Sequence, residues 1–174
     1  QDPESPQIVV PWDDLKKGMP EIHKLNDKFR IDAESITPLD SCNVGPEEWR
    51  EIARIIARNY DSYEGFVILH GTDTMVYTAS ALSFMLANLA KPVILTGAQR
   101  SALVDSRNDA SQNLLTAIEL ANPRFYGRPP LPEVCIFFGG RLLRGNRSIK
   151  RDTSGYMAYE SPNFPDLAEV GDAV

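Results

Sequence analysis

The feature that most constrains the fold is a pair of short apolar runs, Phe66–Leu69 and Pro92–Leu95, separated by a stretch with helical periodicity. Neither run alternates between apolar and polar residues, which is typical of strands covered on both faces. Between them, Thr74–Leu89 places apolar side chains at the spacing of one helix face. A strand, a helix and a strand with such connections pair in parallel through a right-handed crossover. The chain is therefore predicted to be an α/β protein with three layers and a mostly parallel sheet.

Further elements extend this unit on both sides. An amphipathic helix is predicted over Pro46–Tyr60, because a proline and two acidic residues open an apolar pattern of helical spacing. A helix over Arg107–Ala121 and a strand over Val134–Phe138 follow. Residues 29–33 alternate as a half-exposed strand would. Residues 152–174 lack periodicity and are predicted to form a loop with one short strand, and no second domain boundary is indicated.

Composition limits the function classes. At 174 residues, the chain is long enough for one domain with its own core. A net charge of -6 argues against nucleic-acid binding, since phosphate contacts need a basic surface. No apolar run approaches the ~20 residues of a membrane span. Cys42 and Cys135 have no metal-ligand spacing, and Cys135 lies in an apolar run as a buried thiol would.

A polar turn, His70–Thr74, follows the first apolar run and opens the next helix. Folds of this class bind ligands at this edge of the sheet. Two interpretations stay open from the residues alone: a helix cap made by Asp73 or Thr74, and a polar pocket in which Thr72 and Asp73 hold a small zwitterion. His70 is more typical of a hydrogen-bonded core residue than of a base. With only two histidines in the chain, a Ser-His-Asp triad is not favoured.

A basic segment follows the last predicted strand, with Arg141, Arg144, Arg147 and Lys150 spaced three residues apart. The arginines are predicted to form a solvated basic face or a site for one anion. Lys150 is different if it points inward, because a lysine beside a hydroxyl in a poorly solvated site can act as a base. From the residues alone, the chain is an α/β protein with a polar cleft for a small molecule.

Several of these segments resemble the signature sequences of the asparaginase/glutaminase family, in the order that the family has them. Ser83–Leu86 and Gln99 make the chain more similar to the cytosolic, type I enzymes than to the secreted ones. The segments that carry the resemblance are Thr37–Ser41, His70–Met75, Tyr77–Leu86, Lys91–Gly97, Arg144–Lys150 and Ser161–Asn163.

This resemblance implies a cytoplasmic amidohydrolase that converts L-asparagine to L-aspartate and ammonia through a threonine nucleophile, without a metal or organic cofactor. It further implies a homo-oligomer, dimer or tetramer, with no nucleic-acid or membrane partner. Thr72 and Lys150 are expected to manage the proton, and Asp73 to hold the substrate's α-ammonium group. The substrate loop is expected to bind the α-carboxylate and amino groups through Asp40, Ser41 and Cys42.

The chain also departs from the family pattern. The first family motif, Thr-Gly-Gly-Thr, which carries the nucleophile, is absent, and so is the small C-terminal domain. Residues 1–174 therefore correspond to most of an asparaginase N-terminal, Rossmann-like domain. The sequence begins without an initiator Met or a signal-peptide pattern, so we expect a portion of a longer polypeptide whose first strand lies within the sheet.

Two other functions remain open on the sequence alone. One is a catalytically silent module that binds asparagine or aspartate. The other is the amidase subunit of a tRNA-dependent amidotransferase, which the net charge of -6 and the type I likeness argue against.

Overall fold

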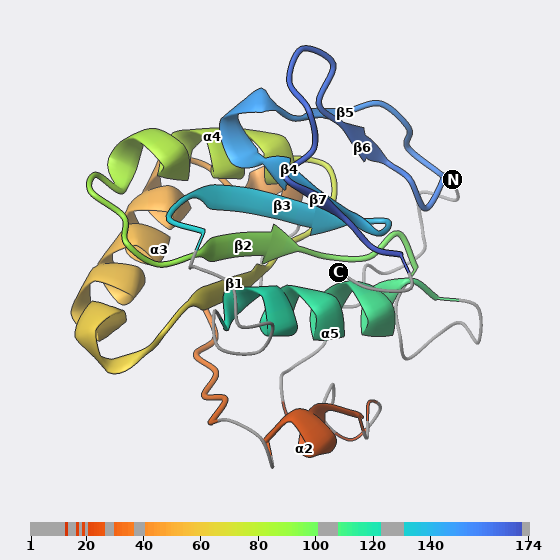
Figure 1. Ribbon diagram of the computed structural model, residues 1–174. Helices are drawn as coiled ribbons and strands as arrows, with labels where there is room; N and C mark the ends of the chain where they lie inside the picture. Colours follow the sequence, from red (N-terminus) through yellow and green to blue (C-terminus); the bar gives the residue numbers. More distant parts are fainter. Residues whose placement is uncertain are drawn as a thin grey trace.

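The computed structural model describes residues 13, 17, 19, 21–26, 30–36, 41–100, 108–122 and 131–171. Its centre is a five-stranded sheet with the order β1-β2-β3-β4-β7 (Figure 1). The first three strands pair in parallel, and the last two add antiparallel at one edge. The strands are β1 (Phe66–Leu69), β2 (Val93–Thr96), β3 (Val134–Phe138), β4 (Arg141–Arg144) and β7 (Ala168–Glu169).

Helices cover both faces of the sheet. The helices α3 (Pro46–Asn59) and α4 (Met75–Met85) pack on one face, and α5 (Ala110–Ala121) packs on the other (Figure 1). Each face of the sheet therefore has its own hydrophobic core. Alternate side chains of β2 pack into them: Val93 and Leu95 lie in the core under α3 and α4, and Ile94 lies in the core under α5. A short helix, α2 (Glu21–Asn26), contributes to a third cluster against α5. The predicted three-layer α/β fold is confirmed.

The longer elements lie close to their predicted positions, and β1 and β3 match them residue for residue. The helix α3 begins as predicted, with Pro46 in its first turn and the Gly45 amide donating to the Glu48 carboxylate over 2.8 Å. The helix α4 ends at Met85, four residues before the predicted end, and Asn88 takes a left-handed conformation with φ of 59°. The predicted start of α5 at Arg107 lies outside the described residues.

Two predictions about short segments are wrong. Residues 30–33 are not in a strand, and the described sheet ends at β1. The C-terminal residues hold two short strands instead of one, β6 (Tyr159–Glu160) and β7. The strand β6 pairs antiparallel with β5 (Ile149–Lys150) in a separate two-stranded ribbon. Within the described ranges, no helix has the length and apolar character needed to cross a membrane.

Candidate active site

The turn that follows β1 is fixed by contacts to other elements and not by a helix cap. Thr74 is the N-cap of α4, but its side chain makes no capping bond. Its hydroxyl instead donates to the Ser41 carbonyl. The Asp73 carboxylate does not cap the helix either, because it accepts a hydrogen bond from Lys150. The helix-cap interpretation of this turn is therefore wrong, and both side chains serve tertiary contacts.

Lys150 points inward from β5 onto this turn. Its Nζ donates to Thr72 Oγ1 over 2.9 Å and to Asp73 Oδ1 over 2.8 Å. The lysine side chain is only 12% exposed, whereas that of Asp73 is 51% exposed. The hydrogen bond from Lys150 lowers the pKa of the Asp73 carboxyl, and partial burial opposes this shift. Asp73 is thus an accessible anion beside a shielded cation that also contacts a hydroxyl.

A residue that the sequence did not single out, Tyr159, completes this arrangement. It is the register partner of Lys150 in the β5–β6 ribbon. Its hydroxyl donates to the Thr72 carbonyl over 2.5 Å, and its ring packs edge-on against Phe138 at 4.9 Å between centroids. Burial raises the pKa of the Tyr159 phenol, with the Asp73 charge as a second cause, so the hydroxyl keeps its proton. Two-residue strands leave no periodic signal that could have revealed it.

The predicted substrate loop lies directly against the turn. It forms a single 3-10 turn, η1 (Ser41–Asn43), in which Ser41 is buried. Gly71 is required there, because a Cβ at this position would lie 2.5 Å from the Cβ of Ser41. Cys42 is exposed, and its thiol donates to Asp73 Oδ2 over 3.5 Å. Asp40, the remaining predicted member, lies outside the described residues.

His70 is held by hydrogen bonds, as the sequence indicated. Its Nδ1 lies 2.7 Å from the Gly71 carbonyl oxygen, and its Nε2 lies 2.9 Å from Thr78 Oγ1. Burial lowers the pKa of His70, and the bond to Gly71 only partly opposes this. Neither ring nitrogen is directed at the Thr72–Lys150 pair.

The prediction of a solvated basic face is wrong for Arg141 and Arg144, which are partly buried and ion-paired, whereas Arg147 is exposed. Arg141 pairs with Asp166 over 2.5 Å, and Arg144 pairs with Glu133 through two nitrogens. The guanidinium groups of Arg144 and Arg147 lie over the Phe164 ring, 4.4 and 5.5 Å from its centroid. Strand β4 places Arg141 beside Asp166, whereas Arg144 at its end and Arg147 in the 3-10 turn η3 (Gly145–Arg147) share the Phe164 ring.

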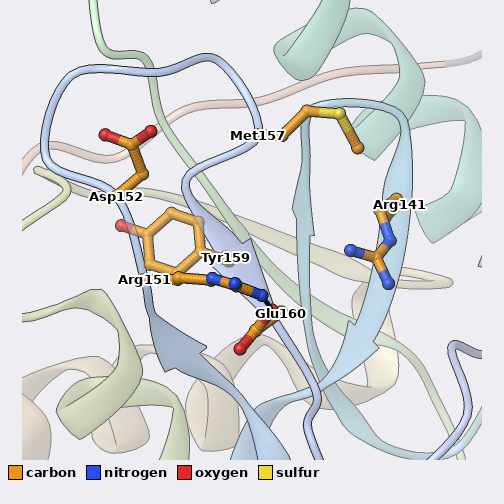
Figure 2. Close-up of a pocket in the computed structure, with 6 residues that line it drawn as sticks. All are labelled: Arg141, Arg151, Asp152, Met157, Tyr159 and Glu160. Carbon is orange, nitrogen blue, oxygen red and sulfur yellow. Dashed lines mark hydrogen bonds and ion pairs between the residues drawn. The ribbon is translucent and has the colours of Figure 1, made fainter.

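An open pocket of about 350 Å³ lies beside the ribbon (Figure 2). Tyr159 contributes its ring to this pocket and its hydroxyl to Thr72. The charged groups of the pocket are already paired, as Arg151 bonds Glu160 over 2.6 Å and the Asp152 carboxylate accepts from the Ser154 and Gly155 amides. The lining residues are Arg141, Arg151, Asp152, Met157, Tyr159 and Glu160.

Residues 3–174 match the family model described as "Asparaginase, N-terminal". The chain belongs to the asparaginase family. It is 51% identical over 155 residues to L-asparaginase 1 of Escherichia coli K12, a match that covers 88% of this chain and 44% of that protein. The family assignment agrees with the expectation drawn from the signature segments.

Solved structures of the asparaginase family have the same fold. The crystal structure of L-asparaginase I from Vibrio cholerae superimposes with a TM-score of 0.82 at 47% identity, covering 97% of this chain and 50% of that one. A probable cytoplasmic L-asparaginase from Campylobacter jejuni gives a TM-score of 0.82 at 32% identity, covering 94% and 50%. The chain thus spans about half the length of these relatives.

Proposed function

We propose that this chain is the greater part of the N-terminal domain of an L-asparaginase, which hydrolyses L-asparagine to L-aspartate and ammonia. The observation that carries the proposal is the position of Lys150 Nζ, within hydrogen-bonding distance of both the Thr72 hydroxyl and the Asp73 carboxylate. A shielded amine, a hydroxyl and an accessible carboxylate at a strand end are the groups that amide hydrolysis of a zwitterion needs.

Charge complementarity explains how substrate binding prepares this site. Asp73 is half exposed and kept ionised by Lys150, so it is suited to bind the α-ammonium group of asparagine. When the substrate ammonium takes over this carboxylate, Lys150 loses its anionic partner. The Lys150 Nζ then keeps its hydrogen bond to the Thr72 hydroxyl, so these two groups stay paired for proton handling.

The chemical step needs a nucleophile that this chain does not contain. In the proposed reaction a threonine hydroxyl attacks the side-chain amide carbon and its proton passes through Thr72 and Lys150 to the leaving nitrogen. Ammonia departs, an ester to the threonine remains, and water then cleaves that ester to give aspartate. We place the threonine on a strand that pairs with the open edge of β1, next to the turn that bears Thr72.

Ser41 and Cys42 are proposed to line the substrate's α-carbon end of the site. Both lie on η1, which contacts the turn through Gly71 and Thr74. Cys42 shares the Asp73 carboxylate with Lys150, so this thiol lies next to the proposed ammonium position. Asp40 is proposed as a further contact on the basis of the family likeness. A cytoplasmic homo-oligomer is likewise proposed on that basis, and sedimentation of the full-length protein would test its assembly.

Release of ammonia from L-asparagine by the full-length protein tests this function. Thr72→Ala and Lys150→Met are each expected to lower kcat by at least ~100-fold, because each removes one member of the proton-handling pair. Thr153→Ala, at an exposed threonine, is the matched control and should keep full activity. Full activity in both site variants would refute the proposed roles.

The alternatives predict other results in the same samples. A silent binding module would bind asparagine or aspartate in calorimetry without releasing ammonia. An amidotransferase subunit would act on glutamine only with a partner and would associate with tRNA.

A further inference from the structure

A line of hydrogen bonds connects the start of α3 to the turn of the candidate site. Trp49 Nε1 donates to Thr78 Oγ1 over 3.0 Å. Thr78 Oγ1 lies 2.9 Å from His70 Nε2, and His70 Nδ1 lies 2.7 Å from the Gly71 carbonyl oxygen. Thr78 is fully buried within α4, so the middle of this line is shielded from water. Gly71 immediately precedes Thr72.

The two ends of this line fix the direction of its outer bonds, and the charge state of His70 fixes the middle one. An indole N–H can only donate, and a carbonyl oxygen can only accept. Nδ1 of His70 must therefore carry a proton, which it donates to the Gly71 carbonyl. In the neutral ring Nε2 is then the acceptor for the Thr78 hydroxyl. Burial lowers the pKa of His70, which agrees with a neutral ring held in this tautomer.

The last acceptor of the line belongs to the peptide unit that joins Gly71 to Thr72. The next carbonyl, that of Thr72, accepts from Tyr159 on the opposite side of the turn. Two consecutive peptide units are thus held by side chains from different elements. Because a peptide unit is planar, fixing the Gly71 carbonyl also fixes the direction of the Thr72 amide and the position of its Cα.

We propose that His70, held by Thr78 and Trp49, is a positioning residue that orients the Gly71–Thr72 peptide for the reaction. The inference rests on the proposed function, and it assigns His70 a role through the backbone and no proton transfer to substrate. Without the line, the Gly71 carbonyl would lose its only side-chain donor among the described residues. The Thr72 hydroxyl and the Asp73 carboxylate would then sample orientations in which Lys150 cannot contact both.

Removal of a single hydroxyl tests the line without changing its packing. Thr78→Val keeps the shape of the side chain but leaves both the indole N–H and Nε2 of His70 without a partner. Thr78→Ser is the matched control because it retains the hydroxyl. We expect kcat/KM of the full-length protein to fall about tenfold in Thr78→Val and to stay within about twofold in Thr78→Ser, since one buried hydrogen bond is at stake. Equal kcat/KM in the two variants would overturn the proposal, even if Thr78→Val is less stable.

Nuclear magnetic resonance gives a second test that needs no turnover. The ring ¹⁵N signals of His70 can be assigned by their loss in His70→Gln. They should report the Nδ1–H tautomer in the unmodified protein, and they should change in Thr78→Val but not in Thr78→Ser. The amide signals of Thr72 and Asp73 should move in Thr78→Val and not in Thr78→Ser. An Nε2–H tautomer in the unmodified protein would contradict the proposed hydrogen bonds, whether or not the protein hydrolyses asparagine. A protein that fails to release ammonia but shows the expected tautomer would refute the proposed function and leave the positioning line supported.

Discussion

Thr72 is contacted at two different oxygens by neighbouring side chains of one ribbon. Lys150 donates to its hydroxyl, and Tyr159 donates to its carbonyl. The first contact concerns the atom proposed to handle a proton, and the second concerns the backbone that carries it. A hydroxyl whose main chain is fixed in this way does not need to be ordered by substrate, which reduces the entropic cost of reaching the reactive geometry.

Tyr159→Phe should lower stability and weaken the site together. Tyr159 is buried and its hydroxyl donates to the Thr72 carbonyl, and loss of one such bond costs about 1 kcal/mol. The urea midpoint of the full-length protein should fall, and KM for asparagine should rise. Tyr77→Phe removes a hydroxyl from a side chain that is 64% exposed and serves as the control. An unchanged urea midpoint in Tyr159→Phe would contradict the assigned bond.

Asp73 should contribute an acid-sensitive part of stability. In the folded state, the hydrogen bond from Lys150 lowers the pKa of the Asp73 carboxyl. The contribution of this pair to the free energy of unfolding is therefore complete above the pKa of the unfolded chain, about 4, and is lost as the pH falls through the lower pKa of the folded protein. Between about pH 4 and pH 2, Asp73→Asn should therefore lose less stability than the unmodified protein. Thermal unfolding across this range measures the difference, with Asp61→Asn as an exposed control. If the stability of Asp73→Asn and of the unmodified protein falls equally with pH, the Asp73–Lys150 pair is not the source of the acid sensitivity.

At the residue scale, reasoning from the residues singled out the turn and Lys150 but left a pocket and a cap as alternatives, and the family resemblance supplied the specific roles. The cap was excluded only by the contacts of Thr74 and Asp73 with other elements. Tyr159 could not be predicted, because its role depends on register within two-residue strands. Asp40 remains a prediction from resemblance.

At the scale of elements, the strand ends approach each other closely enough to exclude side chains. A Cβ at Gly97, just after β2, would lie 2.2 Å from the His70 carbonyl oxygen, just after β1. The same two strand ends are joined by a bond from the His70 amide to the Thr96 carbonyl over 2.9 Å. This approach places the end of β2 directly beside the turn that carries the candidate site.

Gly97→Ala should therefore separate these strand ends. Relief of a clash with a backbone oxygen requires main-chain movement, and overpacking of this kind costs about 1–3 kcal/mol. We expect a lower thermal midpoint and a lower kcat/KM for asparagine, because the His70 carbonyl must shift. Gly45→Ala is the control, since its Cβ would meet nothing closer than Glu48 Oε2 at 3.7 Å. A thermal midpoint equal to that of Gly45→Ala would contradict this close approach.

Elements with a clear period were predictable, and elements defined by pairing were not. The helix α3 shows an apolar face, the side chains of β2 and β3 are all buried, and β1 is a partly buried apolar run, so local sequence was sufficient. Arg141 and Arg144 on β4 do not form the predicted basic face, because each is ion-paired with a carboxylate from outside the basic segment. Residues 30–33 have strand character but no described strand to pair with.

At the scale of the whole molecule, the sheet has two unlike edges. Among the described residues, one edge strand is the short antiparallel β7 and the other is the parallel strand β1. The side chains of β1 are only partly buried, and Leu69 is 45% exposed. These properties support our proposal that a strand carrying the nucleophile pairs with β1.

Residues 1–174 produced alone should consequently bind a hydrophobic dye or self-associate. Within the described ranges no strand pairs with the outer side of β1, and an unpaired edge with apolar side chains provides the surface for both. Dye fluorescence and sedimentation would measure these properties, and the longer polypeptide that supplies the strand should show neither excess dye binding nor aggregation. A monomeric residue 1–174 chain that unfolds cooperatively and binds no dye would refute the proposed strand.

The β5–β6 ribbon also limits how this region can change during evolution. A residue gained or lost inside either strand would shift the pairing by one position and turn Lys150 or Tyr159 to the opposite face. The connecting residues 151–158 can vary in length at lower cost, provided that the pairing is preserved. When relatives of this chain are aligned, gaps should therefore gather in the connection and avoid both strands.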